Sequence, residues 1–368
     1  VYAFGGYNNK SSDAYAYTRN YSARPDRFPI DAAGNLVFDP AIMRVSESGE
    51  IYYNPHIQTK INDISLSSGV KGKCSNNWNW DISNTIGKND FHFFGDKTYN
   101  TSMIITPGTV RQNRFDDGGF NFLQNTFNVD LSHPIEGIGQ SFNLGMGAEF
   151  RYEEYNIYKG EEASYKQYPN AFGQASGSQG FPGFSPADEV KASRKNISAY
   201  VDGELKANEA LLLDGAVRFE NYSDFGSVAT FKLASRYKVA SNFNLRGSVS
   251  TGFRAPSLQQ INFSNTVTSF YGGVLVNSRI ARNDDAITKA AGIEKLKQET
   301  SVNSSIGFAW KPMNNMSVTV DGYMVQVKDR IVLSGLFDKD DATLPVALTT
   351  ALTDMGVQTA QFFANSVN

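Results

Sequence analysis

Apolar residues alternate with polar or small residues along most of this chain. In the segment 142–152, apolar side chains such as Phe142 and Leu144 occupy every second position, and polar ones such as Asn143 fall between them. Side chains of a β-strand point alternately to its two faces, so this period predicts strands with one apolar and one polar face. The same pattern returns at 197–205, 211–219, 231–239, 243–253 and 302–310, where helical spacing fits poorly.

The alternation and the turn residues together predict about eleven strands. Their approximate bounds are 1–9, 58–71, 78–94, 119–132, 140–160, 194–206, 210–222, 227–239, 243–255, 300–312 and 316–332. Many exceed ten residues, whereas strands of soluble proteins usually have about five or six. A strand that crosses a bilayer at a tilt needs about nine to eleven residues. The lengths therefore favour a transmembrane sheet.

The predicted connections between strands alternate in length. Short ones lie near Gly72–Asn77, His133–Gly139, Ala207–Glu209, Ala240–Asn242 and Met313–Asn315. Long ones lie near 10–57, 95–118, 161–193, 256–299 and from 333 onward, and only Asn221–Gly226 is short where a long one is due. Up-and-down strands place every second connection on the same side, and outer-membrane barrels have short periplasmic turns and longer extracellular loops.

Aromatic residues gather near both ends of the predicted strands. Near the short turns are Trp78, Trp80, Phe142, Tyr237, Phe243 and Trp310. Toward the long loops are Phe91, Phe93, Phe94, Tyr152, Tyr155, Tyr158, Phe219 and Tyr222. Two such bands match the aromatic girdles at the interfaces of a membrane barrel, although aromatic residues are also common in strands generally.

The predicted fold is all-β: a transmembrane antiparallel up-and-down β-barrel domain covering 1–368. Bacterial barrels close with an even number of strands, and an open edge is not tolerated in hydrocarbon. Eleven strands therefore predict that further strands belong at both ends. The start at Val1, already inside a strand-like stretch with no signal peptide, predicts a middle portion of something larger.

Composition narrows the function. Apolar residues make up 40% and charged residues 19%, which argues against a disordered chain, and no apolar run approaches the length of a membrane helix. A net charge of −3 gives no basic footprint for nucleic acid. With Cys74 as the one cysteine and three scattered histidines, we expect no internal disulfide and no metal site. No catalytic motif is present, so we expect neither an enzyme nor a cofactor.

Five stretches of this sequence carry a family resemblance. Gly252–Leu258 (GFRAPSL), Leu296–Gly307 (LKQETSVNSSIG) and Val320–Gly335 (VDGYMVQVKDRIVLSG) resemble, in order and spacing, signatures of the later barrel strands of TonB-dependent outer-membrane receptors. Val1–Tyr7 and Gln179–Ala187 also resemble a subgroup of these receptors. The likeness runs nearly from end to end.

The resemblance implies a 22-stranded barrel in the bacterial outer membrane, of which about half is here. It implies energy-coupled uptake of a scarce solute such as a siderophore, vitamin or glycan. The partners would be outer-membrane lipid, a plug domain and the periplasmic TonB protein, which binds a short TonB box. We find neither plug nor TonB box in this chain. Gln298 stands where the family usually has proline. The alternatives are a passive porin or structural barrel, and a soluble secreted β-protein.

Two sets of residues are candidates for binding. Aromatic side chains on long loops can contact a solute, so we expect substrate contacts from Tyr165, Tyr168, Phe181, Phe184, Phe270 and Tyr271. The alternative is that they pack the loops together. Arginines on the polar face are candidates for contact with the plug, namely Arg218, Arg236, Arg246 and Arg254. For these the alternative is ion pairing within the barrel wall.

The last stretch of the chain gives weaker signals. Asp338, Asp340 and Asp341 form an acidic run without the ligand spacing of a calcium site. The apolar residues within 341–364 predict a short loop helix.

Overall fold

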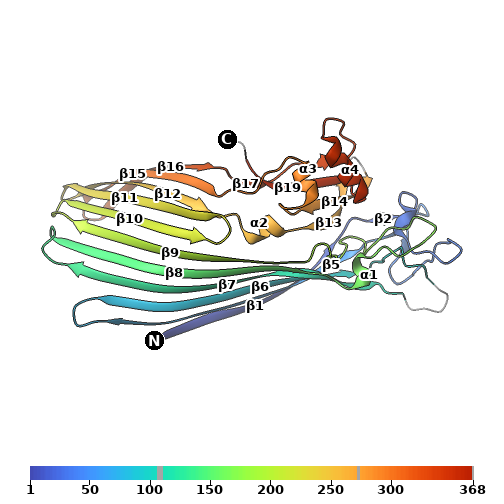
Figure 1. Cartoon of the computed structure of the whole chain (residues 1–368), viewed down its shortest axis with the longest axis horizontal. Helices are drawn as coiled ribbons and strands as arrows, with labels where there is room; N and C mark the ends of the chain where they lie inside the picture. Colours follow the sequence, from blue (N-terminus) through green and yellow to red (C-terminus); the bar gives the residue numbers. More distant parts are fainter. Residues whose placement is uncertain (106–110, 272–273, 367–368) are drawn as a thin grey trace.

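The computed structural model describes residues 1–105, 111–271 and 274–366. Eleven long strands form one sheet in the order β1-β5-β6-β7-β8-β9-β10-β11-β12-β15-β16 (Figure 1). Their bounds are Tyr2–Tyr15, His56–Lys73, Asn79–Asp96, Arg114–Ile135, Ser141–Tyr158, Val190–Lys206, Leu211–Tyr222, Gly226–Ala240, Phe243–Arg254, Glu299–Met313 and Met316–Lys328. The prediction of about eleven strands is confirmed.

Each long strand pairs antiparallel with the next one along the sheet. The chain therefore runs up and down, as the alternating connections predicted. Figure 1 shows the sheet curling, with the long loops gathered at one end, here called the long-loop end, and the tight turns at the other, the short-turn end. Over the described residues the sheet is open, and β1 and β16 are its two edges. No described helix is both long and apolar enough to span a membrane.

The register gives the sheet one apolar and one polar face. Val217 of β10 lies opposite Val201 of β9 and Phe231 of β11, and all three side chains are exposed. Ile197 and Leu233 on the same face are 63% and 59% exposed. A water-soluble sheet would cover such a face with a second layer, whereas lipid tails cover it in a membrane barrel. The described residues place no second sheet there, which argues against the soluble alternative.

The aromatic band at the short-turn end matches the prediction, but the band at the long-loop end matches it only in part. Tyr152, Tyr158, Phe94 and Phe219 share the apolar face, as the register shows. Phe91, Phe93, Tyr155 and Tyr222 have the opposite parity and point to the polar face. Tyr155 is buried there at 1% exposure. These four rings pack inside the curl of the sheet and do not belong to a girdle.

The long loops form small sheets that the alternation pattern did not predict. One consists of β2 (Arg19–Asn20), β4 (Ile51–Tyr53) and β3 (Arg44–Val45), with a core of Phe28, Met43, Tyr53 and Tyr99. The other contains β13 (Asn265–Tyr271), β14 (Val274–Ala281), β19 (Thr359–Asn365), β17 (Ile331–Leu333) and β18 (Phe337–Asp338). Short helices accompany them: η1 (Pro25–Arg27), α1 (Glu162–Tyr165), α2 (Leu258–Asn262), α3 (Ala286–Ala290) and α4 (Val346–Asp354).

The end of the chain confirms one expectation and corrects another. Helix α4 lies inside 341–364, as predicted, but the residues after it form β19, which pairs parallel with β14. The strand predicted over 316–332 instead ends at Lys328, because Asp329 takes a positive φ of 55°. The chain turns there and continues as β17 among the loops.

Candidate functional site

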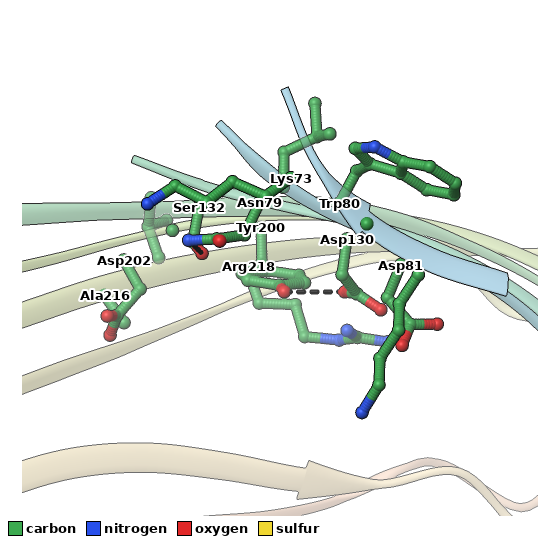
Figure 2. A pocket seen from close by; sticks show the side chains of 15 residues that line it. Lys73, Asn79, Trp80, Asp81, Asp130, Ser132, Tyr200, Asp202, Ala216 and Arg218 are labelled. Carbon is green, nitrogen blue, oxygen red and sulfur yellow. Dashed lines mark hydrogen bonds between the residues drawn. The ribbon is translucent and has the colours of Figure 1, made fainter. Parts of the chain in front are cut away.

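The polar face carries a hollow of about 830 Å³ near the short-turn end. Strands β5 to β10 line it with polar and charged side chains, among them Lys73, Asp81, Asp130, Tyr200, Asp202 and Arg218 (Figure 2). One row of the register crosses five of these strands: Asp81, Asp130, Gly147, Tyr200 and Arg218. The alternation of the sequence places these residues on one face, and the antiparallel pairing brings them to one level.

Two carboxylates in this row lie directly opposite each other. Asp81 of β6 faces Asp130 of β7, an arrangement that repulsion disfavours. Each carboxylate accepts a tyrosine hydroxyl: Tyr2 donates to Asp81 at 2.7 Å, and Tyr200 donates to Asp130 at 2.7 Å. Figure 2 shows the second of these bonds as a dashed line. The tyrosines spread the negative charge and hold both acids on the polar face.

The bond from Tyr200 crosses an intervening strand. Gly147 of β8 lies between Asp130 and Tyr200, and a Cβ there would stand 2.5 Å from the Tyr200 ring. Real Cβ atoms do not approach so closely, so glycine at this position leaves the space that the tyrosine ring fills. The hollow is thus built from wall residues whose side chains are already fixed by one another.

Three of the four arginines proposed for the lumen form ion pairs within the wall. Arg218 donates from Nε to Glu220 at 2.7 Å, Arg246 donates from Nε to Asp321 at 2.8 Å, and Arg254 donates from Nη1 to Glu299 at 3.0 Å. These contacts match the ion-pairing alternative.

Arg236 differs from the other three. It lies opposite Arg246, and no described residue forms an ion pair or hydrogen bond with its guanidinium. Its charge faces the lumen without compensation from the wall.

The aromatic residues expected on the loop 161–193 divide into two groups. Phe181 and Phe184 are buried, the latter at 0% exposure, in a cluster with Tyr155 and Leu258, and the Phe181 ring stacks on Phe93 at 4.5 Å. Neither ring presents a face to a solute, because both pack this loop onto the strands. The substrate-contact expectation is therefore corrected for this pair, and the packing alternative describes them.

The other loop aromatics are more accessible or lie outside the description. Tyr165 and Tyr168 are half-buried, and the Lys166 ammonium sits 5.3 Å from the centroid of the Tyr168 ring. Phe270 and Tyr271 belong to β13, but their side chains fall outside the described residues.

Sequence reasoning missed a group of arginines in the first long loop. Arg24 binds Asp26 through Nε at 2.8 Å and Nη2 at 2.7 Å, and Arg27 lies 3.3 Å from the same carboxylate. Burial lowers the pKa of Arg27 to about 10, and burial also lowers the pKa of Arg19. Burial raises the pKa of Asp26, but the hydrogen bonds and charges of Arg24 and Arg27 outweigh it, so the pKa lies below its ordinary value. The sequence feature that could have revealed this group is the presence of three arginines within nine residues.

A second group, whose members sequence reasoning did not connect, joins two loops around Arg279 of β14. Its Nη2 donates to Ser264 at 2.8 Å, and its Nη1 lies 3.4 Å from Asp188. Asp285, which caps α3, is 3.6 Å away. All these side chains are nearly buried. One guanidinium therefore compensates the charge of two carboxylates that have little access to water. Arg279 and Asp188 are 91 residues apart in sequence, which leaves no local signal.

The comparisons with known proteins agree with this architecture. A family model described as "TonB dependent receptor-like, beta-barrel" matches residues 2–359. The chain belongs to the TonB-dependent receptor family. Members of this family are receptors and transporters rather than enzymes, and their barrels are outer-membrane proteins.

Two curated members are similar in sequence. A protein of Acinetobacter baumannii named "Probable TonB-dependent siderophore receptor PirA" is 26% identical over 260 residues, which are 69% of this chain and 31% of that protein. The ferric enterobactin receptor PirA of Pseudomonas aeruginosa is 23% identical over 237 residues, which are 59% of this chain and 30% of that protein. The chain spans about a third of the length of these relatives.

A solved structure of a TonB-dependent receptor has the same fold. A point mutant of the ferric enterobactin receptor PfeA from Pseudomonas aeruginosa matches with a TM-score of 0.54 at 11% identity, over 98% of this chain and 47% of that one. At this identity the likeness concerns the fold.

The family signatures lie at element boundaries. In GFRAPSL, β12 ends at Arg254 and Ser257 caps α2, its hydroxyl accepting from the Gln260 amide. The LKQE stretch ends at Glu299, the first residue of β15. Glu299 accepts both Arg254 Nη1 and the Ile331 amide, so it ties the three signatures together.

Proposed function

We propose that this protein is the barrel portion of an outer-membrane receptor that imports an iron–siderophore complex by TonB-dependent transport. The observation that carries the proposal is the family match over nearly the whole chain. The siderophore is proposed because the similar proteins are named as siderophore or ferric enterobactin receptors. The apolar face would lie against lipid, and the long loops would lie outside the cell.

The polar face would surround a plug domain. The hollow lined by Asp81, Asp130 and Asp202 offers polar groups at the short-turn end, near the periplasm in this orientation. Arg236 supports the proposal, because an unpaired guanidinium needs a carboxylate or carbonyl partner when water is displaced from it. The three paired arginines would contact the plug through guanidinium N–H groups that are not bound to acids of the wall. These arginines are Arg218, Arg246 and Arg254.

Solute contacts would come from Tyr165 and Tyr168 and, on the other long loop, from Phe270 and Tyr271. Rings on loops above a lumen can stack on the flat groups of a chelate. Transport would then follow when TonB, pulling on the plug, opens the lumen.

Uptake of radiolabelled ferric enterobactin by cells tests this function. We expect cells lacking the receptor to lose uptake, the intact gene to restore it, and a protonophore or a deletion of TonB to abolish it. Uptake that survives the protonophore would instead assign the protein to passive porins. A receptor that binds no siderophore but imports another scarce solute in a TonB-dependent way would correct the solute and keep the mechanism.

Two substitutions test the proposed contacts with the plug and with the solute. Arg236→Gln is expected to weaken plug retention, measured as increased antibiotic leakage through the barrel, while Lys195→Gln, which removes one charge from the apolar face of β9, serves as a matched control. Tyr168→Ala is expected to raise the Kd for the siderophore about tenfold, in line with the loss of a stacked aromatic contact. Phe172→Ala, an exposed ring on the same loop, is the control.

A further inference from the structure

One carboxyl group at the long-loop end of the sheet is buried without a cation beside it. Asp117 of β7 is 0% exposed and is the residue left unpaired where the register between β6 and β7 shifts. The outward row Asp90, Asn121 and Asn156 is already polar, and Asp117 lies beyond it, outside the lipid-facing part of the sheet. An isolated charge in a protein interior is costly, so buried carboxylates normally have a cation as partner.

The loop between β8 and β9, residues 159–189, folds over Asp117. The Phe184 amide donates to the Asp117 backbone carbonyl at 2.9 Å. A Cβ on Gly183 would stand 3.1 Å from the Asp117 Cα, and a Cβ on Gly160 would stand 2.7 Å from the Asp117 carbonyl carbon. Glycine at both positions lets the loop backbone come this close. The docked loop thereby covers the carboxyl group.

The hydroxyl group of Ser178 shows where a hydrogen atom is needed. Its oxygen lies 3.0 Å from Asp117 Oδ1 and 2.6 Å from the backbone carbonyl oxygen of Phe181. A hydroxyl has one hydrogen to donate, and a carbonyl oxygen can only accept. The shorter contact, to Phe181, takes the hydroxyl hydrogen. The contact with Asp117 is then a hydrogen bond only when the carboxyl group itself carries the hydrogen.

The second carboxyl oxygen supports the same assignment. Asp117 Oδ2 is buried and has no hydrogen-bond partner among the described residues. A carboxylate spreads its charge over both oxygens, so each of them needs a donor, whereas a carboxylic acid places its strongest demand on the O–H group. The surroundings of Asp117 therefore satisfy the neutral acid and leave the ionised form without donors.

The charges around Asp117 also favour the neutral form. Burial, and then repulsion by Asp116 and Glu161, raises the pKa of Asp117 well above its ordinary value. The charged groups on the segments packed around it are His92, Asp96, Lys97, Arg114, Asp116, Lys159, Glu161, Glu162 and Lys166. The cations among them are exposed or paired with other acids. No described cation forms an ion pair with Asp117.

We propose that Asp117 is a carboxylic acid in the folded receptor, and that the loop 159–189 docks onto the sheet with uptake of one proton by this group. In the undocked loop the carboxyl group is in water and titrates as an ordinary aspartate, at about pH 4. Docking removes it from water, which the charged form resists. The docked loop is therefore most stable below about pH 4 and loses stability as the pH rises toward the raised pKa.

This pH dependence has the opposite sign to that of the first long loop, where the pKa of Asp26 is lowered. Proton uptake by the loop 159–189 does not depend on the proposed function. Tyr165 and Tyr168 belong to this loop, so docking would also make the solute contacts of the proposed function sensitive to pH.

Hydrogen exchange of the intact receptor in detergent tests the proposal, followed from about pH 5 upward and corrected for the intrinsic pH dependence of exchange. We expect the open population of 159–189 to rise by up to about tenfold per pH unit until the raised pKa is reached. Asp117→Asn has the shape of the neutral acid and can donate to Ser178, so its loop opening should not change with pH. A parent without pH dependence, or an Asp117→Asn variant that keeps it, would overturn the proposal.

A matched control removes another acid from the same loop. Glu189 is exposed, so Glu189→Gln changes the net charge equally and should retain the pH dependence of the parent. If Glu189→Gln abolished this dependence, the effect would belong to the charge of the loop and not to Asp117.

Infrared difference spectroscopy reports the protonation state directly. The spectrum of the parent minus that of Asp117→Asn should show the carbonyl stretch of a protonated carboxylic acid at neutral pH, and a carboxylate band in its place would contradict the proposal. Titration of the parent labelled with ¹³C-aspartate gives the same readout if the variant does not fold. Neither measurement needs a solute, so a failure of siderophore uptake would affect only the proposed function.

Discussion

Arg246 of β12 reaches across the strand beside it to bind Asp321 of β16. Its Nε donates to Asp321 Oδ1 at 2.8 Å, and the residue between them in the register is Gly307 of β15. A Cβ on Gly307 would collide with the Asp321 carboxylate. The same geometry recurs where Tyr200 reaches over Gly147 to Asp130. In both places a glycine in the middle strand lets a polar pair join the strands on either side.

Substitution of this glycine tests the crossing. Gly307→Ala is expected to break the Arg246–Asp321 pair and to lower the thermal unfolding temperature of the receptor in detergent, because the new methyl group occupies the path of the carboxylate. Gly322→Ala on β16 is the control, since a Cβ there meets only one atom at an ordinary 3.9 Å. Equal effects of the two changes would show that backbone freedom, rather than the crossing, matters.

The buried ring of Phe184 is expected to hold the loop between β8 and β9. Phe184→Ala removes a fully buried aromatic side chain, which typically costs about 3–5 kcal/mol. The loss falls on loop docking, so we expect faster protease cleavage within 159–189 while the strands stay protected. Phe172→Ala removes an exposed ring of the same loop and should leave the cleavage rate unchanged.

Removal of the single positive charge of Arg279 is expected to destabilise the two loops strongly. Arg279→Gln leaves Asp188 and Asp285 nearly buried without their cation, and breaking such a pair costs about 3–5 kcal/mol. Hydrogen exchange should rise in both β14 and the segment around Asp188. The matched change Arg282→Gln affects an exposed partner, Asp284, and should cost less than about 1 kcal/mol.

The first long loop should loosen in acid. The pKa of Asp26 is below its ordinary value because Arg24 and Arg27 favour the carboxylate over the effect of burial. The folded loop therefore gains stability from this group above a pH of about 4, and loses it as the pH falls through the lowered pKa. Protease cleavage within 16–55 should increase below a pH of about 4. In Asp26→Asn the loop should be loosened already at neutral pH and change less on acidification.

The long strands could be predicted because each carries its signal locally. The alternation within 142–152 or 231–239 can be recognised without knowing which strands pair with each other. The strand lengths and the order of short and long connections follow from it. Some ends were close, since the strand predicted at 210–222 is observed at Leu211–Tyr222, whereas the strand predicted at 1–9 extends to Tyr15. Strand β16 ended early because one residue, Asp329, adopts a left-handed conformation that apolar spacing does not encode.

The loops and much of the candidate site could not be predicted, because distant contacts build them. Ser278 pairs with Thr359 across two long connections, and strands as short as β18 have no period to detect. Phe184 and Tyr168 look alike in sequence, since both are aromatic residues in a polar loop. Only packing against Phe93 and Tyr155 separates the buried ring from the accessible one.

The glycine crossings have a mechanical consequence. Backbone ladders tie each strand to its immediate neighbours and resist their separation, but they yield more readily when strands slide past one another. A side-chain bond that skips a strand links the two outer strands of one register row directly, so neither of them can slide without stretching that bond. A barrel wall linked in this way keeps its shape when a domain inside it is pulled along the barrel axis. The force would then move the inner domain and leave the strands of the wall in place.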